Sequence, residues 1–230
     1  MQQVLRHGNP VSMASPETRS DFIWRTYSHV AIAILAFTGI EVYLFQSGMA
    51  QTIAQTMLGF NWLLIIGAFM VVGWGATHVA HTVDSQAFQY AALAAYVSAQ
   101  AIIFVPMLYI ASVTAPGVIE SAAGVTLIGV AALTAVVFIT KKDFSFLRGI
   151  LMWVGVLALV GIVSSLLFGF ALGTWFSVAM IGFAGAAVLY DTSNVLHHYS
   201  QDRHVAAALQ LFASIAMMFW YVLRLFMSRD

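Results

Sequence analysis

Long apolar segments separated by short polar stretches dominate the chain. A helix that crosses a bilayer needs about 20 mostly apolar residues. Segments of this kind cover residues 24–45, 60–80, 88–112, 118–139, 147–168, 174–197 and 205–227. The connections between them are short, so the pattern predicts an all-α integral membrane protein with seven transmembrane helices in a single domain, residues 22–230.

Composition supports this fold class and excludes several functions. Hydrophobic residues make up 61% of the chain and charged residues 8%, which is far from a typical soluble domain. The formal net charge is zero, which argues against a nucleic-acid partner. The chain has no cysteine, so disulfides, thiolate metal sites and thioether-linked haem are excluded. The expected surroundings are the lipid bilayer.

The ends of the chain and its basic residues predict an orientation. Residues 1–21 are polar, lack the pattern of a cleaved signal peptide and predict a flexible cytoplasmic tail. Arg6, Arg19, Arg25, Lys141, Lys142, Arg148 and Arg203 would all lie on the side of the N-terminus, whereas Arg224 and Arg229 would lie on the other. The excess of basic residues marks the cytoplasmic side. We therefore expect a cytoplasmic N-terminus and an outside C-terminus, in a bacterial inner membrane.

A carboxylate lies within the sixth apolar segment. At 100° per residue, Asp191, Asn194 and His198 fall on one stripe of that helix. A charge at the centre of a membrane costs about 2.5–3.5 kcal/mol on insertion scales, so such a residue is a candidate functional site. Asp191 could gate a pore by titrating, bind a cation, or be a structural residue hydrogen-bonded to another helix.

Histidines gather at the expected cytoplasmic ends of the helices. The group comprises His29, His78, His81, His197, His198 and His204. Histidines can bind a metal or sense pH, and they are also well tolerated at a membrane interface. The sequence leaves both interpretations open and predicts no metal site.

Two acids and one arginine are expected at the opposite side. Glu41 and Arg224 would lie at similar depth, which favours an ion pair between them. Glu120, at the start of the fourth segment, suggests the alternative that both acids form an outer mouth that attracts cations.

Known classes of helical membrane protein can be compared with the chain. The last segment has no lysine for a retinal Schiff base, and it offers no ligands to an intramembrane zinc site. The histidines crowd at one side, whereas a transmembrane dihaem cytochrome needs pairs at both. No nucleophile–base arrangement can be picked out. We therefore expect neither an enzyme nor a cofactor.

Several stretches together carry a family resemblance. They are Tyr90, the run 97–108 with Pro106, the sequence Lys-Lys-Asp-Phe-Ser-Phe-Leu at 141–147, Tyr190-Asp191 with Asn194, and Leu223-Arg224-Leu225. In these the chain resembles the Bax inhibitor family, also called the transmembrane Bax-inhibitor-motif proteins, in its bacterial branch. The resemblance covers all seven segments. It implies a bundle whose last helix is central, wrapped by two layers of three helices.

The resemblance also implies functions and a site. Some members of the family carry a pH-sensitive calcium leak, in which an aspartate of the sixth helix faces one of the seventh. Asp191 matches the first aspartate, whereas Ser214 stands where the second would be. A serine hydroxyl can donate a hydrogen bond to a carboxylate, but it cannot supply the repulsion between paired carboxylates. The acid and arginine that some relatives carry in the second helix are not evident, and the nearest polar groups are His78, His81 and Asp84.

The expected function follows from the site and the resemblance together. We expect a pH-modulated cation leak that transports Ca²⁺, with Asp191 as the titrating gate and with Ser214, Asn194, His198 and His78 along the pathway or sensing pH. The alternative is a non-conducting regulator that binds other membrane proteins, such as a membrane protease.

Overall fold

The computed structural model describes residues 10–228, in which helices account for nearly all of the secondary structure. A short 3-10 helix, η2 (Val11–Met13), precedes the α-helices. These are α1 (Pro16–Gln46), α2 (Met49–Gly59), α3 (Trp62–Thr82), α4 (Gln86–Thr114), α5 (Val118–Thr140), α6 (Leu147–Phe168), α7 (Gly173–His197) and α8 (His204–Met227). Within the described residues the β-structure is limited to an isolated bridge between Pro10 and Ser200. The all-α fold is confirmed.

Seven of these helices are long and apolar enough to cross a membrane, and they match the seven predicted segments. The additional helix, α2, has 11 residues and lies in what the sequence suggested was a connection. Its Ala50 and Ala54 are buried in a small cluster with Leu44 of α1 and Val105 of α4. A helix this short is stable because of such packing, and the packing cannot be predicted from the sequence of the segment alone.

The N-terminal boundary of the bundle lies earlier than expected. The helix α1 begins at Pro16, where Ser15 Oγ accepts a hydrogen bond from the Thr18 backbone at 3.3 Å. Proline at the first helical position and serine at the cap are typical of a helix start. Val11 is fully buried, and its backbone N–H donates to the Tyr199 carbonyl at 2.8 Å. The predicted tail therefore does not extend to residue 21, and residues 1–9 lie outside the described part of the chain.

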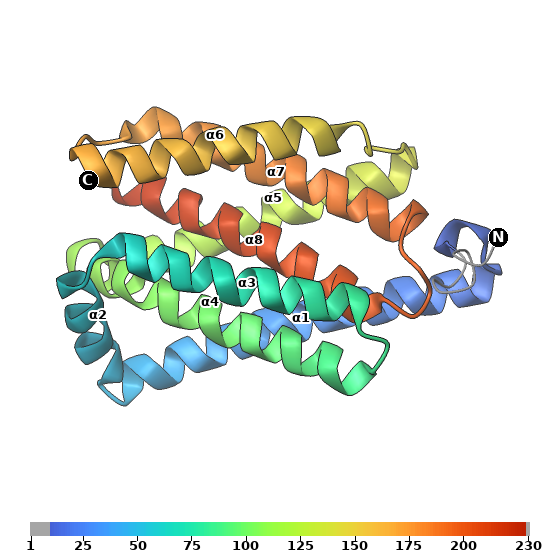
Figure 1. The fold of residues 1–230 in the computed structure, drawn as a ribbon, viewed down its shortest axis with the longest axis horizontal. Coiled ribbons are helices and arrows are strands. Elements are labelled where there is room, and N and C mark those ends of the chain that lie inside the picture. Colours follow the sequence, from blue (N-terminus) through green and yellow to red (C-terminus); the bar gives the residue numbers. More distant parts are fainter. Residues whose placement is uncertain (1–9, 229–230) are drawn as a thin grey trace.

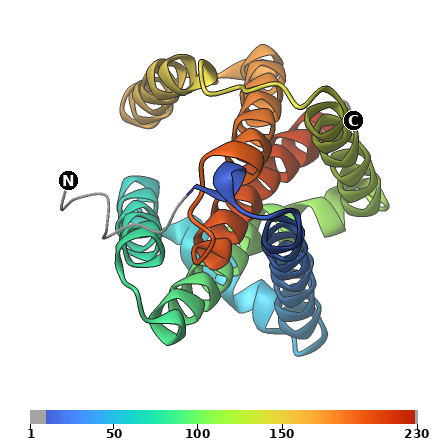
Figure 2. The same cartoon turned by 90° about the vertical axis from the view of Figure 1, so that its right-hand side faces the viewer.

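The last helix, α8, forms the centre of the bundle. Figure 1 shows α8 between a layer of α1, α3 and α4 and a layer of α5, α6 and α7. The end-on view in Figure 2 shows the same arrangement, with α6 outermost. No residue of α8 is exposed, and the helix packs against α1, α3, α4, α5 and α7. The central last helix that the resemblance implied is confirmed.

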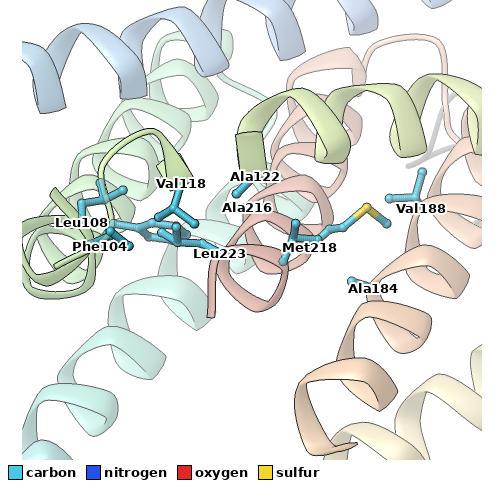
Figure 3. Packing of buried hydrophobic residues seen from close by; sticks show 12 residues of the cluster. Phe104, Leu108, Val118, Ala122, Ala184, Val188, Ala216, Met218 and Leu223 are labelled. Atoms are coloured by element: carbon cyan, nitrogen blue, oxygen red, sulfur yellow. The ribbon is translucent and has the colours of Figure 1, made fainter. Parts of the chain in front are cut away.

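Aromatic packing fixes α8 against its neighbours. Phe104 of α4 is fully buried; its ring stacks on Phe219 with centroids 5.6 Å apart and meets Trp220 edge-on at 4.9 Å. Figure 3 shows this core continuing through Met218 to Val188 of α7. Interiors packed in this way resist small displacements, so α7 and α8 are held in one relative position.

The loops divide into two faces of the bundle. We call the end that carries the start of α1 and the loops 83–85, 141–146 and 198–203 the N-terminal face, and the opposite end the C-terminal face (Figure 1). The basic residues Arg19, Arg25, Lys141, Lys142, Arg148 and Arg203 belong to the N-terminal face, and Arg224 lies near the C-terminal face. The separation of charge agrees with the predicted distribution, while the side of the membrane on which each face lies stays a prediction.

Candidate functional site

Asp191 and Ser214 meet at the contact between α7 and α8. Both are buried, with exposed fractions of 2% and 3%. Ser214 Oγ donates a hydrogen bond of 2.5 Å to Asp191 Oδ2. The antiparallel helices are joined by a short corner, so residues at similar distances from it lie at similar depth. The family resemblance, in which two aspartates face each other, correctly paired these two positions.

A large cavity opens between α3 and α6 on the side of α8 that carries Ser214, the partner of Asp191. We call it the α3–α6 cavity; its volume is about 730 Å³. Its lining is mostly apolar, and its ionisable side chains include Asp191 and, nearer the C-terminal face, Arg224. Gly155 of α6 and Phe183 of α7 lie on its wall.

A second cavity opens at the N-terminal face. This N-face cavity has a volume of about 690 Å³ and is lined by the predicted stripe, Asp191, Asn194 and His198, together with His78. The structure thus brings four of the predicted site residues to one cavity. Its wall also carries Arg148, Arg203 and His81.

The two cavities meet at Asp191. Tyr190, Asp191 and Gln210 line both of them, so this group of side chains forms the boundary between the cavities. Sequence reasoning missed Tyr190 and Gln210 as members of the site. Gln210 lies four residues before Ser214, one helical turn away on α8, and this spacing was the available signal. The Asp191 side chain therefore borders both cavities.

Three histidines of the N-terminal face, His29, His81 and His204, contact tyrosines. His81 Nδ1 donates to the Thr77 carbonyl at 2.9 Å, and its Nε2 lies 3.4 Å from the Tyr199 hydroxyl. His204 Nε2 lies 3.3 Å from the Tyr90 hydroxyl, and His29 stacks on the same tyrosine. Within residues 10–228, no group of three or more His, Cys, Asp or Glu side chains comes together to hold a metal ion.

The loop between α5 and α6 is tied to α7 by Asp143. Its Oδ2 accepts a hydrogen bond from His198 Nε2 at 3.0 Å, and Oδ1 accepts from the Ser145 backbone at 2.8 Å and from Ser193 Oγ at 3.4 Å. Partial burial raises the pKa of Asp143, but the hydrogen bonds from Ser145 and His198 lower it by more, so it lies below the ordinary 3.8. In the sequence Asp143 was noted only as a member of the 141–147 motif.

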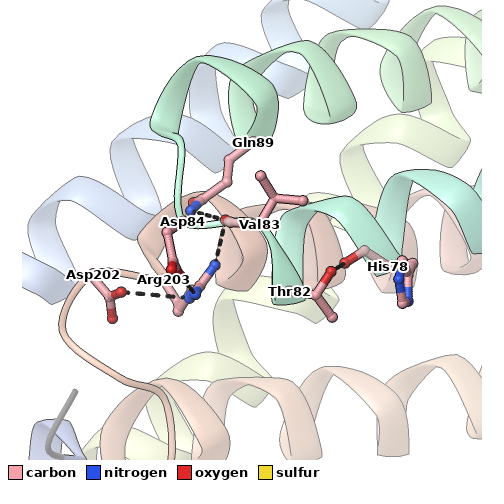
Figure 4. Close-up of polar contacts among 7 residues, drawn as sticks. All are labelled: His78, Thr82, Val83, Asp84, Gln89, Asp202 and Arg203. Carbon is pink, nitrogen blue, oxygen red and sulfur yellow. Dashed lines mark hydrogen bonds and ion pairs between the residues drawn. The ribbon is translucent and has the colours of Figure 1, made fainter. Parts of the chain in front are cut away.

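A buried arginine ties the α3–α4 loop to the α7–α8 corner (Figure 4). Arg203 is 7% exposed. Its Nη1 donates to the Val83 carbonyl at 2.6 Å, its Nη2 pairs with Asp84, and its Nε lies 3.5 Å from Asp202. Gln89 Nε2 donates to the same Val83 carbonyl at 3.0 Å. In the sequence Arg203 was counted only among the basic residues that predict orientation, and this contact was not predicted.

The ion pair expected between Glu41 and Arg224 is not formed. Both carboxyl oxygens of Glu41 are buried without a hydrogen-bond partner among the described residues. Arg224 lines the α3–α6 cavity, whereas Glu41 and Glu120 line a different cavity on the opposite side of α8, between α1 and α5. The sequence allowed the depth of Glu41 and Arg224 in the membrane to be estimated. It did not show towards which neighbouring helices the two side chains point.

Comparison with known proteins agrees with this architecture. A profile of the family described as "Inhibitor of apoptosis-promoting Bax1" matches residues 19–230. Protein LIFEGUARD 4 of Arabidopsis thaliana is 30% identical over 233 aligned positions, which cover 96% of this chain and 90% of that protein. "Modulator of FtsH protease YccA" of Escherichia coli (strain K12) is 34% identical over 116 residues, about half of each protein at 49% and 52%. The profile match spans all seven membrane helices and the Asp191–Ser214 pair, and the chain belongs to the Bax inhibitor family of integral membrane proteins.

Proposed function

We propose that the chain is a slow, pH-modulated cation leak, permeable to Ca²⁺, with Asp191 as its gate. The observation that carries the proposal is that the α3–α6 cavity and the N-face cavity meet at the Asp191 carboxylate. A cation that passes from one cavity to the other has to pass this group. Ionisable residues inside a membrane bundle mark ion pathways.

In the proposed mechanism the hydrogen bond between Ser214 and Asp191 belongs to the closed state. Ser214 holds the carboxylate against α8 by its hydrogen bond. Protonation of Asp191 would remove the negative charge from the junction and weaken the hydrogen bond that it accepts from Ser214, because charge-assisted hydrogen bonds are the stronger kind. The protonation state is thus coupled to the contact between α7 and α8.

Basic side chains in both cavities favour a slow leak over an efficient channel. Arg224 lines the α3–α6 cavity, and Arg148 and Arg203 line the N-face cavity. Positive groups along a pathway raise the barrier for cations. The rate should therefore be slow, and the charge at Asp191 should be the main attraction along the path. We also propose that the chain is not an enzyme.

A flux assay tests the proposal. Pure protein is reconstituted into liposomes that contain a calcium-sensitive dye, and flux is followed from mildly acidic to mildly alkaline pH. We expect pH-dependent flux in the parent, and reduced flux without pH response in Asp191→Asn. Asp21→Asn is the control, because Asp21 is an exposed acid of the N-terminal face, paired with Arg25. Absence of flux in the parent, or unaltered flux and pH response in Asp191→Asn, refutes the proposal.

A second candidate function is the regulation of another membrane protein, such as a membrane protease. One relative is named a modulator of a protease, and α6 offers a surface for such a partner. No residue of α6 is buried, and the helix packs mainly on α7 at the edge of the bundle (Figure 2). Photocrosslinkers at Trp153 of α6 should then capture the protease in native membranes, whereas crosslinkers at Trp24 of α1, equally exposed, should not. Equal capture from both positions would count against this surface.

A further inference from the structure

The cavity between α1 and α5 has a composition unlike the two at Asp191. This α1–α5 cavity has a volume of about 460 Å³, within the usual range for small-molecule sites. Near the N-terminal face, the rings of Tyr27 and Phe138 close the gap between the two helices, with centroids 5.8 Å apart. Towards the C-terminal face the helix backbones stay apart within the described residues, and α8 forms the floor. The rim includes the half-exposed Val42 and Leu127, so the cavity opens towards lipid.

The charge in this cavity is entirely acidic. Glu41 and Glu120 line it, and no lysine, arginine or histidine does so among the residues that the structure describes. Glu120 is exposed at the rim, whereas Glu41 is 7% exposed. The remaining wall is almost wholly apolar and includes the aromatic rings of Phe37, Phe45 and Phe219.

Glu41 has no hydrogen-bond partner in the part of the chain that the structure describes, and the hydroxyl groups in the cavity wall donate to backbone carbonyls instead. Thr126 Oγ1 donates to the Ala122 carbonyl at 2.7 Å, and Thr38 Oγ1 donates to the Ile34 carbonyl at 2.9 Å. Ser112 Oγ donates to the carbonyl of residue 109 at 2.8 Å. A buried carboxyl group without a hydrogen bond is costly. A cationic group bound in the cavity would satisfy it.

The lining identifies the chemistry of that group. A bare divalent cation is a poor fit, since Ca²⁺ takes six to eight oxygen ligands and this wall presents few free oxygens. An organic cation fits better, because its charge pairs with the carboxylate and interacts with aromatic faces, while its apolar body covers the wall. We propose that the α1–α5 cavity binds a membrane-soluble organic cation, whose charged centre lies at Glu41.

Tetraphenylphosphonium is a suitable probe, because its charge is fixed and its body is apolar. Its matched control is tetraphenylborate, which has nearly the same shape and the opposite charge. Binding of the radiolabelled probe is measured by equilibrium dialysis with the full chain in nanodiscs of zwitterionic lipid, against empty nanodiscs. We expect saturable binding of one cation per chain and no saturable binding of the anion. Equal binding of both ions, or no binding above that of empty nanodiscs, overturns the proposal.

Variants locate the site. Glu41→Gln keeps the shape and removes the charge, and should weaken binding at least tenfold; Glu120→Gln at the rim should weaken it less. Leu127→Trp should block the cavity while Glu41 stays in place. Asp191→Asn should bind as the parent does, because Asp191 lies across α8, so this inference and the proposed leak fail independently. Unchanged binding in Glu41→Gln or Leu127→Trp overturns the assignment, and so does a larger loss of binding in Glu120→Gln than in Glu41→Gln. Thermal unfolding checks that each variant is folded.

Discussion

Ser214 Oγ donates a hydrogen bond of 2.5 Å to Asp191 Oδ2, across the contact between the central helix α8 and its neighbour α7. The family resemblance implied that, in some members, an aspartate stands where Ser214 does. The serine satisfies one lone pair of the carboxylate without adding a second negative charge. The pair therefore forms an interhelical hydrogen bond, and any titration of the pair itself involves a single carboxyl group.

Replacing Ser214 with alanine tests the structural part of this relationship. Ser214→Ala leaves the buried Asp191 carboxylate without its donor, so the free energy of unfolding should fall by on the order of 1 kcal/mol, as for other hydrogen bonds between membrane helices. Reversible unfolding in detergent measures this. Ser177→Ala provides the control, since Ser177 is equally buried on α7. The same loss in both variants would contradict a specific role for the hydrogen bond.

The resemblance to the Bax inhibitor family located this pair, and local patterns agree with it. The helical period places Asp191, Asn194 and His198 on one stripe, and a short corner between two helices equates depths along them. The angular positions of helices around the bundle are not local, which is why the expected pair of Glu41 and Arg224 is absent from the described structure.

The contacts of loops also escaped the sequence. Arg203 binds a backbone carbonyl of a loop 120 positions earlier in the chain, and no pattern of residue types announces such a contact. The short helix α2 was missed for a related reason, since its burial against α4 depends on tertiary packing. Helices long enough to cross a bilayer can be recognised from their length and apolar composition, and all seven of these helices were predicted.

The hydrogen bonds of Asp143 predict a dependence of stability on pH. Its pKa in the fold lies below the ordinary 3.8, so the ionised carboxylate stabilises the fold above pH 3.8, and this contribution is lost as the pH falls through the lowered pKa. Because the side chain is 44% exposed, the contribution should be at most about 1 kcal/mol. Thermal unfolding of the parent and of Asp143→Asn should differ at neutral pH and converge below pH 3.8. A difference that stays constant with pH would assign the effect to something other than the charge.

Arg203 should stabilise the N-terminal face by joining two loops. Arg203→Gln removes the pairing with Asp84 and weakens the hold on the Val83 carbonyl, so it should cost about 1.5–3 kcal/mol, the usual value for hydrogen bonds of a charged group. Hydrogen exchange should accelerate at residues 83–85 and 198–203. Arg25→Gln is the matched control, because the Arg25–Asp21 pair is exposed and should contribute about 0–1 kcal/mol. Equal effects of the two changes would show that burial of Arg203 does not matter.

Two glycines of α7, less than one helical turn apart, should respond differently to the same substitution. A Cβ atom at Gly185 would lie 3.4 Å from Leu133 Cδ1 of α5 and 3.6 Å from Met218 Cε of α8, whereas at Gly182 it would meet no atom within 4 Å. The two further methyl groups of Gly185→Val therefore enter a filled contact and should cost about 1–3 kcal/mol through overpacking. Gly182→Val changes the intrinsic helix preference equally but points into open space. The difference in unfolding free energy between the two variants isolates the packing of α7 against α5 and α8; similar values would mean that this contact is loose enough to absorb a valine, and the fixed register of Asp191 and Ser214 would then need another cause.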